Sequence, residues 1–341
     1  MKFGFGHVPT EHFEEHAALV EHAENLGFEY AWVPDQTFHR DPIALLARLA
    51  GRTKRIRLGV GVTNPYTRHP VVVARSAATL AEMAPGRISI GIGAGNKKQL
   101  LAPLGFDQGA AAGRCREAAE LIRQLVAGKR VNFEGSFFRA LDVQLELPAA
   151  PAVDVYLAGR GPRMLTAAGA VADGVIIGGL CTPKGIEFAL DRVRAGCVDA
   201  GRQLADLQIV SWVTCVVTAD RPSVLDRLRP EIAHIIGGAP DDVLEAIGLS
   251  REVVGKIKEV YWRNGIPAAA AHVTDECVDA FAIVGDGIDV AERITALDRV
   301  GVTQFSVLMP QAPIADHRRT LETFAESILP HFAESRAVVS Q

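Results

Sequence analysis

The stretch IRLGVGVTNPYTRHPVVVARSAATLAEMAPGRISIGIG, residues 56–93, decides the fold class. It begins with an apolar run at Ile56 to Thr63 and continues with an amphipathic segment of helical period at Val71 to Met83. A Pro-Gly pair closes that segment, and a second apolar run follows at Arg87 to Gly93. Strands that are apolar almost throughout are typical of parallel sheets with both faces buried. The stretch therefore predicts a strand–helix–strand unit of an α/β protein.

The same unit recurs on both sides of this stretch. Strands are predicted at Phe3 to Val8 and at Tyr30 to Pro34, with a helix at Glu11 to Asn25 between them. Later strands are predicted at residues 153–158, 174–178, 209–217 and 304–309, and later helices at 110–127, 162–171, 184–200, 288–300 and 317–332. Eight strands that alternate with helices predict a (β/α)8 TIM barrel, with residues 1–341 as a single domain.

Two segments depart from this alternation. Residues 131–147 alternate around Glu134-Gly135-Ser136, which predicts a β-hairpin as an excursion from the barrel. Residues 219–285 contain several proline and glycine breaks, and they predict a mostly helical insertion rather than a flexible linker. A doubly wound sheet is the competing architecture. However, Gly4 and Gly6 are not followed by a third glycine that opens a helix, so the dinucleotide-binding fingerprint is missing.

The composition is that of a globular protein with a large core. Hydrophobic residues make up 48% of the 341 residues, which excludes a mainly disordered chain. The formal net charge of −4, from 36 basic and 40 acidic residues, gives no general attraction for nucleic acid or anionic membranes. Apolar runs such as residues 207–217 are far shorter than the roughly 20 residues that cross a bilayer. We therefore expect neither nucleic acid nor a membrane among the partners of this protein.

The cysteines indicate a reducing compartment. None of the five forms a C-x-x-C pair, and their spacing is irregular, so we predict reduced thiols, no disulfides and no metal site. The amino terminus reaches Glu14 and Glu15 without the charged and apolar regions of an export signal. Together these observations predict a cytoplasmic protein.

Polar residues at the carboxyl ends of the predicted strands are the candidates for chemistry, because the active site of a (β/α)8 barrel lies there. His7 follows the first strand, and it is either a proton-transfer or substrate-binding group or a structural histidine. Asp35 follows the second strand, where its carboxylate either caps the next segment or accepts a hydrogen bond from a ligand. The run Gly61 to Pro65 suits a bulge that a flat ligand approaches closely. Alternating glycines in the fourth strand leave space for a ring or ease barrel packing: Gly91, Gly93 and Gly95.

Glycine-rich turns after the fifth and sixth strands are candidates for phosphate binding. Arg160 and Gly161 stand directly before a predicted helix, and Gly178 and Gly179 follow the sixth strand. Free backbone N–H groups at such turns, with a cation nearby, bind phosphate well. An ordinary strand-to-helix turn has the same composition, so both interpretations stand at this point.

Six groups of motifs are specific in combination. They are MKFG at 1–4, GFEYAW at 27–32, LGVGVTNPY at 58–66, GR at 86–87 with GIGAG at 91–95, GP at 161–162 with ML at 164–165, and ADG at 172–174. With these motifs the chain resembles the bacterial-luciferase-like flavin and deazaflavin oxidoreductases. Within that superfamily it is most similar to the methylenetetrahydromethanopterin reductases, which use the deazaflavin coenzyme F420. The resemblance covers most of residues 1–218 and resumes at 282–309.

The resemblance implies a barrel that binds F420 at its mouth, and a non-proline cis peptide bond between Gly61 and Val62. It also implies site residues, position by position. Asp35, Asn64, Gly95 and Gln99 match positions that contact the deazaflavin or its ribityl chain, and Arg160 and Gly161 match the phosphate-binding turn, with Gly178 and Gly179 as neighbours.

The chain departs from the family at positions that matter for proton transfer. Many relatives have a histidine where this chain has Gln36, and the methanopterin reductases have acidic residues where it has Gly6 and Asn96. Glutamine and asparagine do not titrate near neutrality, so proton transfer would fall to other groups or to water. The residues that we expect to be catalytic are His7, Asp35, Gln36 and Asn96, with His39 as a further titratable group.

The resemblance implies an F420-dependent oxidoreductase that transfers hydride between deazaflavin C5 and a carbon of an imine, iminium, carbonyl or alcohol. An iminium substrate would need no strong acid, which suits the loss of the acidic residues. The alternatives are an FMN-dependent monooxygenase of the same superfamily and a flavin- or deazaflavin-binding protein without turnover. Because the family usually forms dimers or larger assemblies, we expect a homo-oligomer that acts on a small molecule.

Overall fold

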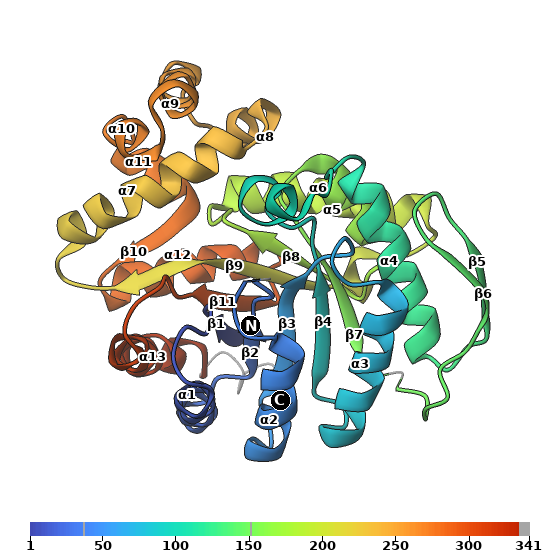
Figure 1. Ribbon diagram of the computed structural model, residues 1–341. Helices are drawn as coiled ribbons and strands as arrows, with labels where there is room; N and C mark the ends of the chain where they lie inside the picture. Colours follow the sequence, from blue (N-terminus) through green and yellow to red (C-terminus); the bar gives the residue numbers. More distant parts are fainter. Residues whose placement is uncertain (37, 151, 334–341) are drawn as a thin grey trace.

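The protein folds as a closed barrel of eight parallel strands (Figure 1). The computed structural model describes residues 1–36, 38–150 and 152–333. Neighbouring strands pair in the order β1, β2, β3, β4, β7, β8, β9 and β11, and β11 pairs with β1 to close the ring. The predicted (β/α)8 barrel is thus confirmed. The strands are β1 (Lys2–Gly6), β2 (Tyr30–Val33), β3 (Arg57–Thr63), β4 (Ile88–Ile92), β7 (Asp154–Ala158), β8 (Gly174–Gly178), β9 (Gln208–Val217) and β11 (Gln304–Leu308).

Helices surround this ring, as the alternating sequence pattern predicts. The sequence analysis named no helix between the second and third strands, and α2 fills that place. Asp41 starts α2 by accepting hydrogen bonds from the backbone N–H groups of Ile43 and Ala44. The helices of the ring are α1 (Phe13–Leu26), α2 (Pro42–Arg52), α3 (Pro70–Met83), α4 (Ala111–Val126), α5 (Pro162–Val171), α6 (Pro183–Asp199), α12 (Gly287–Arg299) and α13 (Ile314–Ser327).

Two excursions leave the ring before β7. A π-helix, η1 (Lys97–Leu101), and a short 3-10 helix, η2 (Ala102–Leu104), follow β4 directly. The antiparallel strands β5 (Val131–Glu134) and β6 (Arg139–Val143) then form the predicted hairpin beside α4 (Figure 1). Another short 3-10 helix, η3 (Leu204–Asp206), precedes β9.

Five helices lie between β9 and the additional strand β10 (Ala282–Gly285), and Figure 1 shows them as a group outside the ring of barrel helices. β10 pairs with the last residues of β9, beyond the part of β9 that pairs with β8. The sequence analysis did not foresee this ninth strand. The helices are α7 (Arg221–Gly238), α8 (Asp241–Ala246), α9 (Arg251–Asn264), α10 (Ile266–Ala270) and α11 (Asp275–Phe281).

The two faces of the barrel strands are packed differently. Outward side chains such as Phe3 and Phe5 pack against the helices, whereas the inward side chains form a separate cluster rich in aromatic rings. Glycines make room for these rings, because a Cβ on Gly6 would lie 2.6 Å from Cζ2 of Trp212. The inner cluster contains Tyr30, Trp32, Tyr156, Ile176, Val210 and Trp212.

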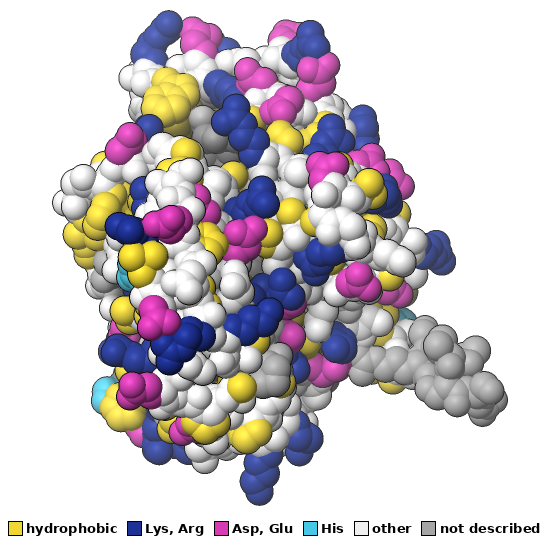
Figure 2. All heavy atoms as spheres, turned by 90° about the vertical axis from the view of Figure 1, so that its right-hand side faces the viewer, with side chains coloured by type: hydrophobic (Ala, Val, Ile, Leu, Met, Phe, Trp, Pro, Cys, Tyr) yellow, Lys and Arg dark blue, Asp and Glu magenta, His cyan; other side chains and the backbone are white. Residues whose placement is uncertain are grey.

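The surface carries charges of both signs. On the face turned toward the viewer in Figure 2, cationic and anionic side chains are interspersed. No helix in the described part of the chain has the length and apolar character to span a membrane. The five cysteines are free and buried, in agreement with the predicted thiols: Cys115, Cys181, Cys197, Cys215 and Cys277.

Candidate active site

The ends of β2 and β3 are joined through Asp35. Its carboxylate is buried, and Oδ2 accepts hydrogen bonds from Oγ1 of Thr63 at 2.6 Å and from Nε of Arg68 at 2.8 Å. Arg68 also pairs with Asp41 at 2.6 Å, so it links the loop after β2 to the loop after β3. The sequence analysis did not name Arg68. Its position five residues after the end of β3, on the carboxyl-end face, was the available signal.

The turn after β3 is shaped by Asn64. Its buried side chain accepts hydrogen bonds from the backbone N–H groups of Tyr66 at 3.1 Å and Thr67 at 3.0 Å. The preceding Gly61–Val62 peptide bond is cis, as the resemblance implies. The Val62 side chain lies against the fourth strand, because a Cβ on Gly93 would lie 2.6 Å from its Cγ2 and one on Gly91 would lie 2.8 Å from its Cγ1. Gly91 and Gly93 therefore accommodate Val62, whereas Gly95 lies next to Asn64.

The end of β4 turns into the π-helix through Gly95 and Asn96. Gly95 has a φ of 71°, which favours glycine, and its carbonyl oxygen accepts a hydrogen bond from Nε2 of Gln108 at 2.8 Å. Oδ1 of Asn96 caps the π-helix by accepting from the backbone N–H groups of Lys98 and Gln99. The Asn96 amide also donates to Oε1 of Gln99 at 3.2 Å, and both side chains are exposed. These residues form one edge of the barrel mouth, which is the opening at the carboxyl ends of the strands.

The turns after β7 and β8 meet at Arg160. A Cβ on Gly179 would lie 3.0 Å from Nη1 of Arg160, so the guanidinium packs directly over this glycine. Nη1 is buried without a hydrogen-bond partner among the described residues, and burial lowers the pKa of Arg160. Gly161 is the N-cap of α5, and a Cβ on Gly161 or Gly178 would meet nothing within 4 Å. The turns thus combine a buried guanidinium nitrogen that lacks a hydrogen bond to the described residues with open glycine surface.

A cavity of about 490 Å³ connects the end of β4 with helices α7 and α9. Lys98 forms part of its wall, with its ammonium 3.7 Å from the ring centroid of Trp262. His234 contributes a ring whose Nδ1 lies 2.9 Å from the hydroxyl oxygen of Tyr261. Sequence reasoning missed His234, Tyr261 and Trp262 because residues 219–285 contain no motif that it could interpret. The lining comprises Gly95, Asn96, Lys97, Lys98, Gln108, Arg160, His234, Ile235, Gly237, Gly238, Ala239, Pro240, Tyr261 and Trp262.

Helix α7 also brings an acidic group toward this site. Oγ1 of Thr214, which is buried on β9, donates a hydrogen bond to Oε1 of Glu231 at 3.3 Å. Burial raises the pKa of Glu231, although the Thr214 hydrogen bond and the charge of Arg160 act in the opposite direction. Glu231 was not among the residues named from the sequence.

His7 lies apart from the other candidate active-site residues. Its ring faces away from the barrel interior, because it follows Phe3 and Phe5 on the face of β1 that packs against the helices. Nε2 of His7 lies 2.9 Å from Oε1 of Glu11. Burial lowers the pKa of His7 to about 4, so the ring is neutral near pH 7.

Two further candidates lie in the loop after β2. The side chains of Gln36 and His39 are exposed, and the backbone N–H of His39 donates to the carbonyl oxygen of Gln36 at 2.7 Å. Gln36 adjoins the buried Asp35, which places this loop at the rim of the mouth. The residues that the structure gathers at the mouth are Asp35, Asn64, Gly95, Asn96, Gln99, Arg160, Gly161, Gly178 and Gly179.

Known proteins share this fold. Residues 2–304 match the family described as luciferase-like monooxygenase. The chain belongs to this luciferase-like family. The sequence of this luciferase-like protein is 35% identical over 334 residues to a 5,10-methylenetetrahydromethanopterin reductase of Archaeoglobus fulgidus, with 97% of this chain and 99% of the relative covered.

Two further matches cover nearly the whole luciferase-like chain. An F420-dependent glucose-6-phosphate dehydrogenase of Beutenbergia cavernae is 32% identical over 336 residues, with 93% of each chain covered. The structure of the coenzyme F420-dependent tetrahydromethanopterin reductase of Methanopyrus kandleri superposes with a TM-score of 0.85 at 30% identity. That match covers 97% of this chain and 99% of the other.

Proposed function

We propose that this luciferase-like enzyme is a coenzyme F420-dependent oxidoreductase. In this proposal it transfers hydride to or from an imine, iminium, carbonyl or alcohol carbon of a small molecule. Two of the matched proteins are named as F420-dependent, and each covers nearly the whole chain. Because fold alone does not determine function, the proposal rests mainly on the residues at the mouth.

The observation that carries the proposal is the guanidinium of Arg160. One of its nitrogens is buried without a partner among the described residues, beside the open surface of Gly161 and Gly178. The charge of Glu231 acts on Arg160, but no hydrogen bond from the described part of the chain satisfies Nη1, and a buried donor without an acceptor is costly unless a ligand supplies one. A phosphate group would meet this need, and the glycine turn before α5 offers backbone N–H groups to it. This donor set fits the phosphate of F420.

The remaining mouth residues fit a flat ring held against the barrel. When bound, the deazaflavin would supply or accept the hydride at its C5 carbon. We assign contacts with the ring and its ribityl chain to Asp35, Asn64, Gly95 and Gln99, with Gly61 and Val62 beneath the ring. We assign the phosphate to Arg160, Gly161, Gly178 and Gly179.

The proton-transfer groups must come from elsewhere, since Gln36 and Asn96 do not titrate near neutrality. We assign this role to Glu231, because it is a carboxyl group on α7 that hydrogen-bonds to Thr214 of β9 and because burial raises its pKa. Glu231→Gln is expected to flatten the pH profile of kcat with a carbonyl substrate. An unchanged profile would remove this assignment.

The proposal is tested by titrating the purified protein with oxidised F420 and, in parallel, with FMN. We expect micromolar or tighter binding of F420 that FMN does not match. Arg160→Ala is expected to weaken F420 binding by about 10- to 100-fold, which corresponds to one charged hydrogen-bond set. The matched control is Arg163→Ala, which removes an exposed guanidinium of α5, three residues along the chain, and should not change the affinity.

Other outcomes of this titration would overturn the proposal. A preference for FMN would favour the luciferase-like monooxygenase instead. F420 binding without hydride transfer to or from any imine, carbonyl or alcohol would favour a binding protein without turnover. Equal affinities in the Arg160→Ala and Arg163→Ala variants would contradict the assigned phosphate site.

The organisation of the chain belongs to the same proposal. We infer that residues 219–285 are an insertion in a single barrel domain, because α7 and α9 form one wall of the cavity at the mouth.

The buried, free thiols support a cytoplasmic location. Exposed apolar side chains on α3, Val72 and Met83, support a homo-oligomer. A monomer mass in light scattering at micromolar concentration would contradict the last point.

A further inference from the structure

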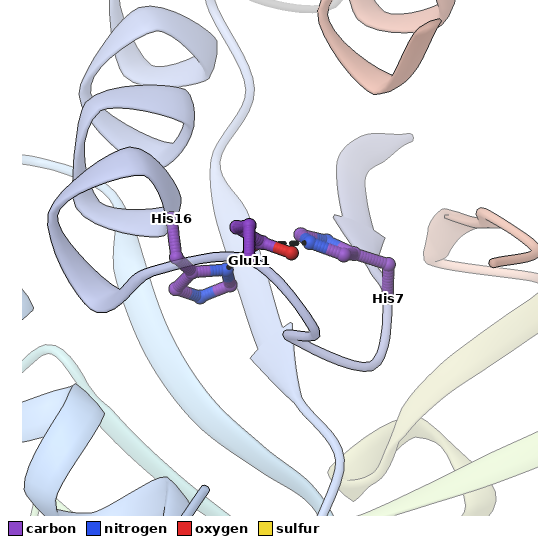
Figure 3. Close-up of side chains that lie close together, drawn as sticks. All are labelled: His7, Glu11 and His16. Carbon is purple, nitrogen blue, oxygen red and sulfur yellow. Dashed lines mark hydrogen bonds and ion pairs between the residues drawn. The ribbon is translucent and has the colours of Figure 1, made fainter. Parts of the chain in front are cut away.

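Three histidines and a glutamate gather outside the barrel, between the end of β1 and the helices α1 and α13. Figure 3 shows His7 at the end of β1, Glu11 in the following loop and His16 on α1. His317 of α13 packs against His7, with the ring centroids 4.3 Å apart. All three imidazoles are at most 2% exposed. This cluster is separate from the residues that we assign to the active site.

The side chains of His7, Glu11 and His16 converge on one point. Oε1 of Glu11 lies 2.9 Å from Nε2 of His7 and 2.9 Å from Nδ1 of His16. One donor atom from each of the three residues lies within 4.8 Å of the other two. Zinc takes nitrogen and oxygen ligands at about 2.0–2.2 Å, which places tetrahedral ligands about 3.3 Å apart. To match this geometry the two contacts of Glu11 lengthen by about 0.4 Å, and the two ring nitrogens, which lie within 4.8 Å of each other, come to about the same separation of 3.3 Å.

Hydrogen bonds within the cluster use only part of its polar atoms. A carboxylate accepts, so both imidazoles donate their N–H groups to the same oxygen of Glu11. The opposite ring nitrogens, Nδ1 of His7 and Nε2 of His16, are buried without a partner among the described residues. Nδ1 of His317 is in the same condition, while its Nε2 contacts the carbonyl oxygen of Pro310. Buried polar atoms are almost always satisfied in native proteins, so a proton on any of these nitrogens needs an ordered water molecule as its acceptor.

We propose that His7, Glu11 and His16 form a binding site for one divalent transition-metal ion, with zinc as the best match to the donor set. Two neutral imidazoles and one carboxylate are common zinc ligands, and a water molecule would complete the coordination. On binding, each imidazole proton moves from the nitrogen that faces Glu11 to the opposite ring nitrogen. The carboxylate then balances one of the two charges of the ion.

The geometry assigns a structural role to this site. His7 follows β1, and Glu11 and His16 belong to the start of α1, so a bound ion would tie the first strand to the first helix. Entry is possible from the side of Glu11, whose side chain is 8% exposed, whereas both imidazoles are more deeply buried. An ion that binds the folded chain and not the unfolded chain raises the apparent stability.

The test is a zinc titration of the purified full-length protein after removal of metals with a chelator. In competition with a chromophoric chelator, we expect one zinc ion per chain. Glu11→Gln and His16→Gln are expected to weaken zinc binding by more than about 100-fold, because loss of an outer partner of a ligand alone costs 10- to 100-fold. His272→Gln, which replaces an exposed histidine far along the chain, is the control and should bind as tightly as the unchanged protein.

Two measurements on the unchanged protein keep the proposal testable even where a variant fails to fold. Zinc is expected to raise the Tm by several degrees, and cobalt is expected to give visible d–d bands without a thiolate charge-transfer band. The proposal is wrong if the unchanged protein does not retain zinc in the competition, or if Glu11→Gln and His16→Gln fold and bind zinc as it does. A thiolate charge-transfer band would place the ion on a cysteine and would also refute the proposal.

Discussion

The two ends of the barrel both hold charged side chains and a cavity of about 490 Å³, but they use their charges differently. At the amino ends of the strands, one oxygen of the buried Glu24 carboxylate accepts hydrogen bonds from the backbone N–H groups of Lys54, Arg55 and Ile56, at 3.0, 2.6 and 2.8 Å. Arg87 donates to the carbonyl oxygens of Ile56, Ala50 and Thr53. Both charged groups therefore form hydrogen bonds with backbone atoms.

At the carboxyl ends of the strands, two cationic side chains lack such hydrogen bonds to described residues for part or all of their polar atoms. Arg160 keeps an unpartnered nitrogen among the described residues, and Lys98 rests only on aromatic rings of α9 in the contacts that the structure gives it. In contrast, Arg123 and Asp173, which line the cavity at the opposite end, pair with each other at 2.8 Å. This difference shows that the burial of a charged side chain does not by itself indicate a functional site. A buried charge without a partner is the better indicator.

The largest effect is expected at the amino end. Glu24→Ala leaves the buried N–H groups of Arg55 and Ile56 without acceptors and should lower the free energy of unfolding by about 3 kcal/mol or more. Urea denaturation measures this, and Glu82→Ala, which removes an exposed carboxylate of α3, should stay within about 0.5 kcal/mol of the unchanged protein. A small loss at Glu24 would remove the distinction between the two ends.

The stabilisation by Glu24 should also depend on pH. Burial acts to raise the pKa of Glu24, but the backbone N–H groups outweigh it and hold the pKa below its usual value. A carboxyl group with a lowered folded-state pKa stabilises the fold above its unfolded pKa and loses this contribution as the pH falls through the folded pKa. The stability difference between the unchanged protein and Glu24→Ala should therefore shrink below about pH 4. A difference that grows on acidification would have the wrong sign.

An intermediate effect is expected at Gly178, on binding and not on folding. A methyl group there meets no protein atom within 4 Å, so Gly178→Ala should unfold at the same urea concentration as the unchanged protein. If the open surface receives the cofactor, the same methyl group should weaken F420 binding by about tenfold or more. Gly51→Ala, which adds a methyl group in equally open space on α2, is the control for affinity. Unaltered F420 affinity in Gly178→Ala would place the ligand elsewhere.

The smallest effect is expected at Lys98. Its ammonium is exposed at the rim of the cavity, so its attraction for an anionic ligand is screened by salt. Lys98→Ala should weaken F420 binding by about two- to fivefold at low ionic strength and by less at high ionic strength. Isothermal titration at two salt concentrations measures this. A loss that is independent of salt would argue for packing against Trp262 as the cause.

Much of the fold follows from the sequence because its signals are local. The apolar strands and the helix at Val71 to Met83 have clear periodicity, and the eight barrel strands lie where it predicts them. The helix α2 was not named, although Asp41 and Pro42 supply a cap and a first-turn proline. β10 is only four residues long and directly follows α11, so its sequence carries no separate strand signal.

The candidate site was harder to predict, because side-chain direction and distant contacts decide it. Gly6 ends β1 and His7 directly follows it, yet the alternation of the extended backbone directs His7 toward Glu11 and Gly6 toward Trp212. The contact of Asp35 with Arg68 spans 33 residues of the sequence. The wall of the cavity includes Tyr261 and Trp262, which belong to α9 and lie much later in the sequence. No local pattern encodes such pairs. Position at the strand ends indicated Asp35 and the glycine-rich turns, and the family resemblance added Gln99 and the role of each residue, but neither gave their partners.

The most direct test of the central claim uses the intrinsic fluorescence of the three tryptophans of the chain. Trp32 and Trp212 pack inside the barrel with ring centroids 6.2 Å apart, and Trp262 lines the cavity at the mouth. F420 bound at the mouth should quench tryptophan fluorescence in a saturable way, with the same affinity as equilibrium dialysis gives. Saturable binding in dialysis without any change in tryptophan fluorescence would contradict the claim that the mouth is the cofactor site.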